Sequence, residues 1–138
     1  YSETIEKDII ADYVEKGYVY YRYVNIPYNN QPSHLAAEAS YCAAEQNLFF
    51  PYKALLYTYA AADDGFLTEN LTKYANLVGL DDDKFSACIE SDAFALAYND
   101  DISYAQSQNV TATPTFLVNG KLVTANALIS TIDDLLLN

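Results

Sequence analysis

The sequence predicts one α/β domain in which a block of helices is inserted between the parts of a small β-sheet. Apolar residues recur at helical spacing over residues 2–15, and residues 18–27 are dense in β-branched and aromatic side chains. Residues 33–108 then return to helical patterns, and a strand–turn–strand pattern occupies residues 115–123 before a last helix. No repeat or linker interrupts this order, and 138 residues suit a single compact core.

The first two elements are predicted from the amino-terminal end of the chain. Ile5, Ile9 and Tyr13 lie on one helical face with charged residues between them. Gly17 is predicted to end this helix, because glycine accepts the left-handed conformation common at that position. The next segment, "YVYYRYVNIP" over residues 18–27, is predicted to be a strand buried between helices.

The inserted helices are predicted from residues typical of helix starts and ends. Ser33, Thr68 and Asp81 are predicted to cap the starts of helices, and Pro51 is predicted to lie in a first turn. Gly79 is predicted to end the helix that begins at Thr68. Within the Ala-rich first inserted helix, Glu38 and Glu45 are predicted to occupy polar positions.

The carboxy-terminal end of the chain predicts a hairpin followed by an amphipathic helix. Asn119-Gly120 separates two short apolar runs and is the strongest short-range hairpin signal. In the segment after it, Leu128, Ile132 and Leu135 share one helical face, which is predicted to be buried.

The charge of −12, from 19 acidic and 7 basic residues, limits the possible partners. Nucleic acid is excluded because phosphate binding requires a basic surface, and anionic lipid is disfavoured for the same reason. No segment is apolar enough to predict a membrane span. Asp81-Asp82-Asp83 and Asp100-Asp101 lack the glycine and distal glutamate of a calcium loop, so solvated helix starts are expected there. His34 is predicted to be a surface or capping residue, and no metal or cofactor is expected.

The chain has two cysteines, Cys42 and Cys88, which lie 46 positions apart. They cannot form a local redox pair, and with a single histidine they are a poor metal set. The residues alone leave a long-range disulfide and two buried thiols both open. An even cysteine count in a small acidic chain favours an oxidising compartment.

Four segments, taken in order, resemble one family. They are "ETIEKDIIADYVEKGYVYYRYVNIP", "EASYCAAEQNLFFPYKALL", "KFSACIES" and "VTATPTFLVNGKLV". Together they resemble the DsbA-like thiol–disulfide oxidoreductases of the thioredoxin superfamily. The resemblance implies a thioredoxin core over residues 1–32 and 109–138 with a helical insertion over residues 33–108.

The resemblance also implies a site. The Thr113–Pro114 bond is expected to be cis, and Ala112, Thr113 and Pro114 are expected to bind an extended, cysteine-containing protein or peptide substrate. The family's Cys-x-x-Cys is absent from this sequence, and it is expected, with the first strand, just before Tyr1. A chain without these parts is expected to be inactive alone and to need a complementing chain or redox partner.

The two cysteines match helix-interior positions of the family, so the resemblance implies a structural Cys42–Cys88 disulfide and an extracytoplasmic location. Two alternatives remain. One is a non-catalytic binding or structural subunit that kept the fold and lost the redox pair. The other is a relative that handles glutathione conjugates, which is disfavoured because Ser2 lies too late in the first helix to serve as its site serine.

Overall fold

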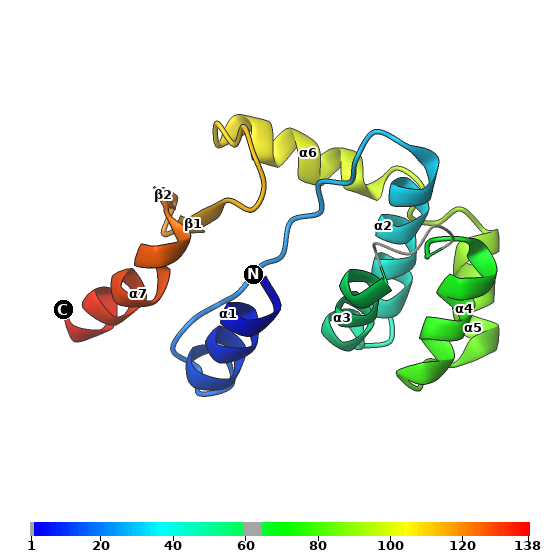
Figure 1. The fold of residues 1–138 in the computed structure, drawn as a ribbon, viewed down its shortest axis with the longest axis horizontal. Helices are drawn as coiled ribbons and strands as arrows, with labels where there is room; N and C mark the ends of the chain where they lie inside the picture. The colour runs from blue at the N-terminus through cyan, green and yellow to red at the C-terminus, as the bar shows by residue number, and fades with distance from the viewer. Residues whose placement is uncertain (1, 60–64) are drawn as a thin grey trace. The chain divides into compact units, whose positions relative to one another are not determined.

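The computed structural model describes residues 2–59 and 65–138, which form mostly helices and one small sheet (Figure 1). The elements in chain order are α1 (Ser2–Ile9) with a π-helical turn (Ile10–Val14), α2 (Gln31–Ala44), α3 (Phe49–Tyr59), α4 (Thr68–Leu77), α5 (Asp82–Glu90), α6 (Ala97–Ser107), β1 (Phe116–Val118), β2 (Lys121–Val123), a 3₁₀ turn (Ala125–Ala127) and α7 (Leu128–Leu137).

The chain divides into two compact units. The first unit comprises Tyr1–Val24 and Tyr104–Asn138, and the second unit comprises Asn25–Ser103. Each unit has its own hydrophobic core. The predicted boundaries at residues 33 and 108, between a core and a helical insertion, stay a prediction.

The second unit is a cluster of helices in which α2 packs against α3, α4 and α5 (Figure 1). Its core contains three large, fully buried side chains, Tyr52, Phe85 and Leu71. The Tyr52 and Phe85 rings lie 5.6 Å apart, and the Tyr52 hydroxyl donates a 3.0 Å hydrogen bond to the Leu71 carbonyl. Burial raises the pKa of Tyr52 above the usual tyrosine value. The Tyr52 hydroxyl is therefore hydrogen-bonded although the side chain is fully buried.

Two predictions for α2 are wrong. Ser33 is not the cap, because Asn30 precedes the helix in extended conformation and accepts the Ser33 N–H at 2.9 Å. Pro32 fits the first turn, where its missing N–H costs nothing. Glu38 is only 6% exposed rather than on the polar face, because α2 is surrounded by other helices and has little free surface. Glu45 is exposed, as predicted.

The predicted Thr68 cap is also wrong, because Thr68 is the first residue of α4 and the residue that precedes the helix, Leu67, makes no side-chain cap hydrogen bond. Two other predicted helix ends in the second unit are confirmed. Asp81 caps α5, accepting the Lys84 N–H at 2.9 Å. Gly79 follows α4 with φ of +84°. Asp101 was expected on a solvated surface, but its side chain is buried. Its carboxylate accepts hydrogen bonds from the Asn25 N–H at 2.9 Å and from the Tyr41 hydroxyl at 2.5 Å. A buried carboxylate is tolerated here because these donors replace water.

The first unit packs α1 and α7 against the β1–β2 hairpin. The buried residues are Ile9, Leu128 and Ile132, and the partly buried apolar residues around them are Ile5, Tyr13, Val14, Val19, Tyr21, Phe116, Val118, Val123 and Ile129. The hairpin register pairs Phe116 with Val123 and Val118 with Lys121. Asn119 and Gly120 both have positive φ, 49° and 78°, as the predicted tight turn requires. Leu135 is 48% exposed, so its predicted burial is wrong; α7 extends past the core after Ile132.

The predicted strand over residues 18–27 is wrong. This segment is extended but belongs to no sheet, because the sheet in the described chain consists of β1 and β2 alone. Its side chains nevertheless alternate: Val19 and Tyr21 pack on the first unit's core, whereas Tyr18 and Tyr20 are 63% and 91% exposed. The alternation is typical of strands, but a strand also requires a hydrogen-bonded neighbour.

Candidate functional site

The predicted substrate-binding residues Ala112, Thr113 and Pro114 lie in the loop between α6 and β1, within the first unit. α6 ends at Ser107, and Asn109, two residues further on, has φ of +58°. The Asn109 N–H donates to the Gln106 carbonyl, and the Val110 N–H donates to the Ala105 carbonyl, both at 3.0 Å. This pair of bonds is a Schellman motif, which fixes the start of the loop.

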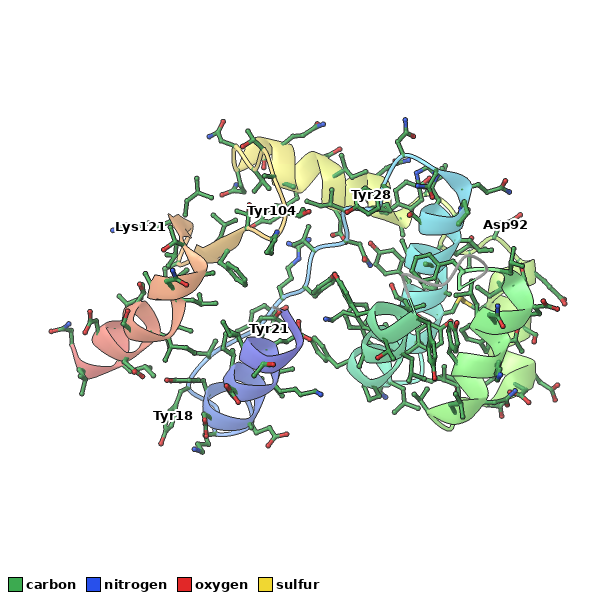
Figure 2. The ribbon with its side chains drawn as sticks, viewed as in Figure 1. Tyr18, Tyr21, Tyr28, Asp92, Tyr104 and Lys121 are labelled. Atoms are coloured by element: carbon green, nitrogen blue, oxygen red, sulfur yellow. A yellow bond between two sulfur atoms is a disulfide. The ribbon has the colours of Figure 1, made fainter. Side chains whose placement is uncertain are left out.

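The other end of the loop is fixed by the hairpin. Phe116 packs against the first unit's core and pairs with Val123 across the sheet. Leu117 points to the opposite face, where it pairs with Leu122, which is 57% exposed. An apolar surface therefore lies directly after the loop. Lys121 lies at the turn end of the hairpin (Figure 2).

The loop itself is exposed, and it contains a cis peptide bond and one internal hydrogen bond. Ala112, Thr113 and Pro114 are all exposed, and the Thr113–Pro114 peptide bond is cis. The Thr115 hydroxyl donates a hydrogen bond to the Ala112 carbonyl, across the intervening Thr113 and Pro114. In the described residues, the N–H and C=O of Thr113 take part in no hydrogen bond. An unpaired main chain beside a strand is a surface to which an extended peptide can add.

The two cysteines lie in the second unit and form a disulfide with an Sγ–Sγ distance of 2.06 Å. It joins α2 to α5, with Cys42 fully buried and Cys88 half-buried. The structure thus contains the disulfide, rather than the two free thiols that the residues alone left open. Because the sequence has only these two cysteines, no thiol of this chain is free to attack a disulfide.

His34 contributes to packing rather than to a catalytic set. Its ring stacks on Tyr98 with centroids 4.7 Å apart. Within residues 2–59 and 65–138, no three His, Cys, Asp or Glu side chains come together as metal ligands. None of the helices described has the length and apolar character needed to cross a bilayer.

Polar contacts near the core of the first unit tie its segments together. The Tyr13 hydroxyl donates to Asp133 on α7 at 2.7 Å, and this hydrogen bond raises the pKa of Tyr13. Tyr21 lies beside α1 (Figure 2) and donates to Glu6 at 2.8 Å. The Arg22 guanidinium lies 4.5 Å from the Tyr104 ring centroid. Tyr13 thus links the π-helical turn to α7, and Tyr21 and Arg22 link the extended segment to α1 and to Tyr104.

Sequence reasoning selected residues 112–114 but did not predict the hydrogen bond between the Thr115 hydroxyl and the Ala112 carbonyl. The side chain follows the proline and carries a hydroxyl, but such a residue has no fixed bonding partner until the loop is folded. The left-handed Asn109 at the end of α6 was also missed. The signal for it was present, because asparagine is the residue other than glycine that most often ends a helix this way.

Comparison with known proteins agrees with this architecture. Residues 1–136 match the thioredoxin family model. The fold matches the crystal structure of oxidised BdbD from Bacillus subtilis with a TM-score of 0.78 and 23% identity, covering 99% of this chain and 78% of that chain.

Matching stretches also occur within much longer proteins. The chain is 31% identical over 120 residues to the Na⁺/H⁺ antiporter NhaA 3 of Salinispora tropica, covering 87% of this chain and 18% of the antiporter. It is 36% identical over 87 residues to the Na⁺/H⁺ antiporter NhaA of Herminiimonas arsenicoxydans, covering 63% of this chain and 14% of that antiporter. The chain therefore spans less than a fifth of the length of these curated relatives. The predicted DsbA-like, thioredoxin-like fold is confirmed, and the chain belongs to the thioredoxin family.

Proposed function

We propose that this chain supplies the substrate-binding side of a thiol–disulfide oxidoreductase. The observation that carries the proposal is the exposed, unpaired main chain of Thr113, held at the start of a hairpin in a thioredoxin-family fold. A substrate segment in extended conformation would pair with Thr113 and place its cysteine beside Pro114, while Ala112 adds little bulk to obstruct it.

The chemistry requires a thiolate that this chain does not contain. Disulfide exchange proceeds by attack of a thiolate on a sulfur, and a helix N-terminus lowers the pKa of a cysteine placed there. We propose that a Cys-x-x-Cys immediately before Tyr1 in the native protein provides it, at the start of the helix that includes α1. The Cys42–Cys88 disulfide lies in the second unit and is proposed to be structural.

The proposed substrates are secreted or envelope proteins, and the proposed location is extracytoplasmic. A disulfide between two helices persists in an oxidising compartment and is rare in a reducing one. Substrates with a net positive charge are favoured over acidic ones, because the chain carries a charge of −12.

The test uses the full native protein, with any residues that precede Tyr1. Purified protein is assayed for dithiol-dependent reduction of a protein disulfide and for oxidation of a reduced peptide with two cysteines. We expect activity in at least one direction, and a trapped mixed disulfide whose peptide cross-links to residues 112–114. Cys42 and Cys88 are expected to remain bonded throughout, as read by mass spectrometry of alkylated peptides.

The competing function is a non-catalytic thioredoxin-fold binding module, which the same exposed main chain would serve. Residues other than Cys-x-x-Cys before Tyr1, together with no thiol chemistry in the full protein, would establish that alternative. Peptide binding at residues 112–114 would then persist without exchange.

A second candidate function comes from the curated relatives. Both antiporters described above contain a stretch similar to this chain within a far longer protein. We propose that the native protein is, or associates with, a membrane cation–proton antiporter. The check is to isolate the native protein from detergent-solubilised membranes and measure sodium-dependent proton exchange in vesicles that contain it. A native protein of about the mass of this chain, with no antiporter bound, would contradict the idea.

A further inference from the structure

We propose that Thr115 is a positioning residue of the disulfide-exchange site, whose hydroxyl holds residues 112–114 in the shape that presents the Thr113 main chain to a peptide. This inference rests on the proposed function and adds a residue to the same site. It concerns how the substrate is bound rather than the exchange of sulfur bonds.

The loop is fixed at both ends by contacts that do not involve the substrate-binding residues. At one end the Val110 N–H is bonded to the Ala105 carbonyl of α6. At the other end Phe116 is packed in the core and paired with Val123. The intervening residues lie outside any helix or strand, so their conformation depends on local contacts.

Within that span, the Thr115 hydroxyl makes the one local bond. It donates to the Ala112 carbonyl and so closes a small ring around Thr113 and Pro114. In the described structure the exposed Thr111 side chain, on the other side of Ala112, makes no such bond. Thr115 is half-buried, and its position next to Phe116 couples the ring to the packed strand.

The bond has two consequences for an incoming peptide. It holds the backbone in place before binding, which lowers the conformational entropy lost on association. It also engages the Ala112 carbonyl within the loop, while the N–H and C=O of the adjacent, exposed Thr113 make no hydrogen bond in the described structure. A peptide is therefore directed to pair at Thr113, in the register that brings its cysteine to Pro114.

The test compares three variants of the full native protein: Thr115→Val, Thr115→Ser and, as matched control, Thr111→Val. Valine keeps the β-branched shape and removes the hydroxyl, whereas serine keeps the hydroxyl. Thr115→Val is expected to raise KM for an extended disulfide peptide by roughly three- to ten-fold, the effect of one lost hydrogen bond, with little change in kcat. Thr115→Ser and Thr111→Val are expected to match the wild type.

A second substrate separates positioning from general damage. A small aromatic disulfide cannot pair with the main chain, so its reduction rate is expected to be unchanged in Thr115→Val. Equal losses with both substrates, or a KM in Thr115→Val equal to that of Thr111→Val, would overturn the role of Thr115 while leaving the oxidoreductase intact. Wild-type protein that is inactive on both substrates would overturn the proposed function and this role with it. Thermal unfolding of each variant confirms that the compared proteins are folded.

Discussion

The two units of this molecule solve the same packing problem in different ways. The second unit surrounds a core of fully buried side chains with helices and ties α2 to α5 through a disulfide. The first unit has a smaller core, a two-stranded sheet and several exposed apolar side chains, among them Tyr18, Tyr20 and Leu137. The candidate site lies in the unit with the smaller core, while exposed apolar side chains occur in both units, Tyr28, Leu77 and Leu96 among them in the second unit.

The charges are divided in the same way. Residues 25–103 hold 12 acidic and 3 basic residues, whereas residues 1–24 and 104–138 hold 7 acidic and 4 basic residues. The second unit therefore carries −9 of the net −12. Such a charge favours solubility and opposes nonspecific association of the helical cluster, while the first unit, which carries the surface proposed to receive a peptide, has the remaining charge of −3.

The largest effect is expected from removing the disulfide. Cys42→Ala combined with Cys88→Ala is expected to lower the free energy of unfolding of the second unit by about 4 kcal/mol, because the cross-link closes a long loop in the unfolded chain. Amide hydrogen exchange resolves the two units. Protection is expected to fall in α2 and α5 and to hold at Ile9 and Ile132. Equal loss of protection in both units would contradict their separation.

The next largest effect comes from comparing two positions of α7. Ile132 is 6% exposed and Leu135 is 48% exposed on the same helix. Ile132→Ala is expected to lower the free energy of unfolding by about 2–4 kcal/mol, because it leaves a cavity in a small core. Leu135→Ala, the matched control, is expected to cost less than about 1 kcal/mol. Urea unfolding measures both, and similar losses would show that the core extends to the end of α7.

The smallest effect is a pH dependence located in the second unit. Glu38 is buried, its Oε1 atom finds no hydrogen-bond donor in the described structure, and burial followed by repulsion from Asp92 raises its pKa. The folded state therefore keeps the proton to a higher pH than the unfolded chain does. Glu38 contributes stability below the ordinary carboxyl pKa, and this contribution is lost as pH rises through the raised value.

Glu38→Gln is consequently expected to stabilise the protein at pH 7 and to lose that advantage near pH 4. Glu45→Gln, directly after the same helix, is the control, since Glu45 is exposed. Urea unfolding at the two pH values measures the difference. A constant difference between Glu38→Gln and wild type at both values would show that the carboxyl does not titrate in this range.

The sequence by itself determined most features that depend on neighbouring residues. The hairpin at Asn119-Gly120, the Asp81 cap and the helix end at Gly79 all arise from local backbone preferences, which act within a few residues. The order of the segments also sufficed to recognise the DsbA-like fold. Pro114 and its neighbours could be selected as a site because the recognised motif is continuous in sequence.

Only the tertiary structure decided the features that depend on what surrounds a residue. Glu38 is buried and Leu135 exposed, against their helical patterns, because burial depends on which elements pack against a face. The segment over residues 18–27 has strand-like residues but no strand, because pairing requires a neighbour that local propensity cannot supply. The Thr115 bond to Ala112 and the unpaired Thr113 likewise appear only when the loop is folded, since a hydrogen bond depends on distance rather than on residue type.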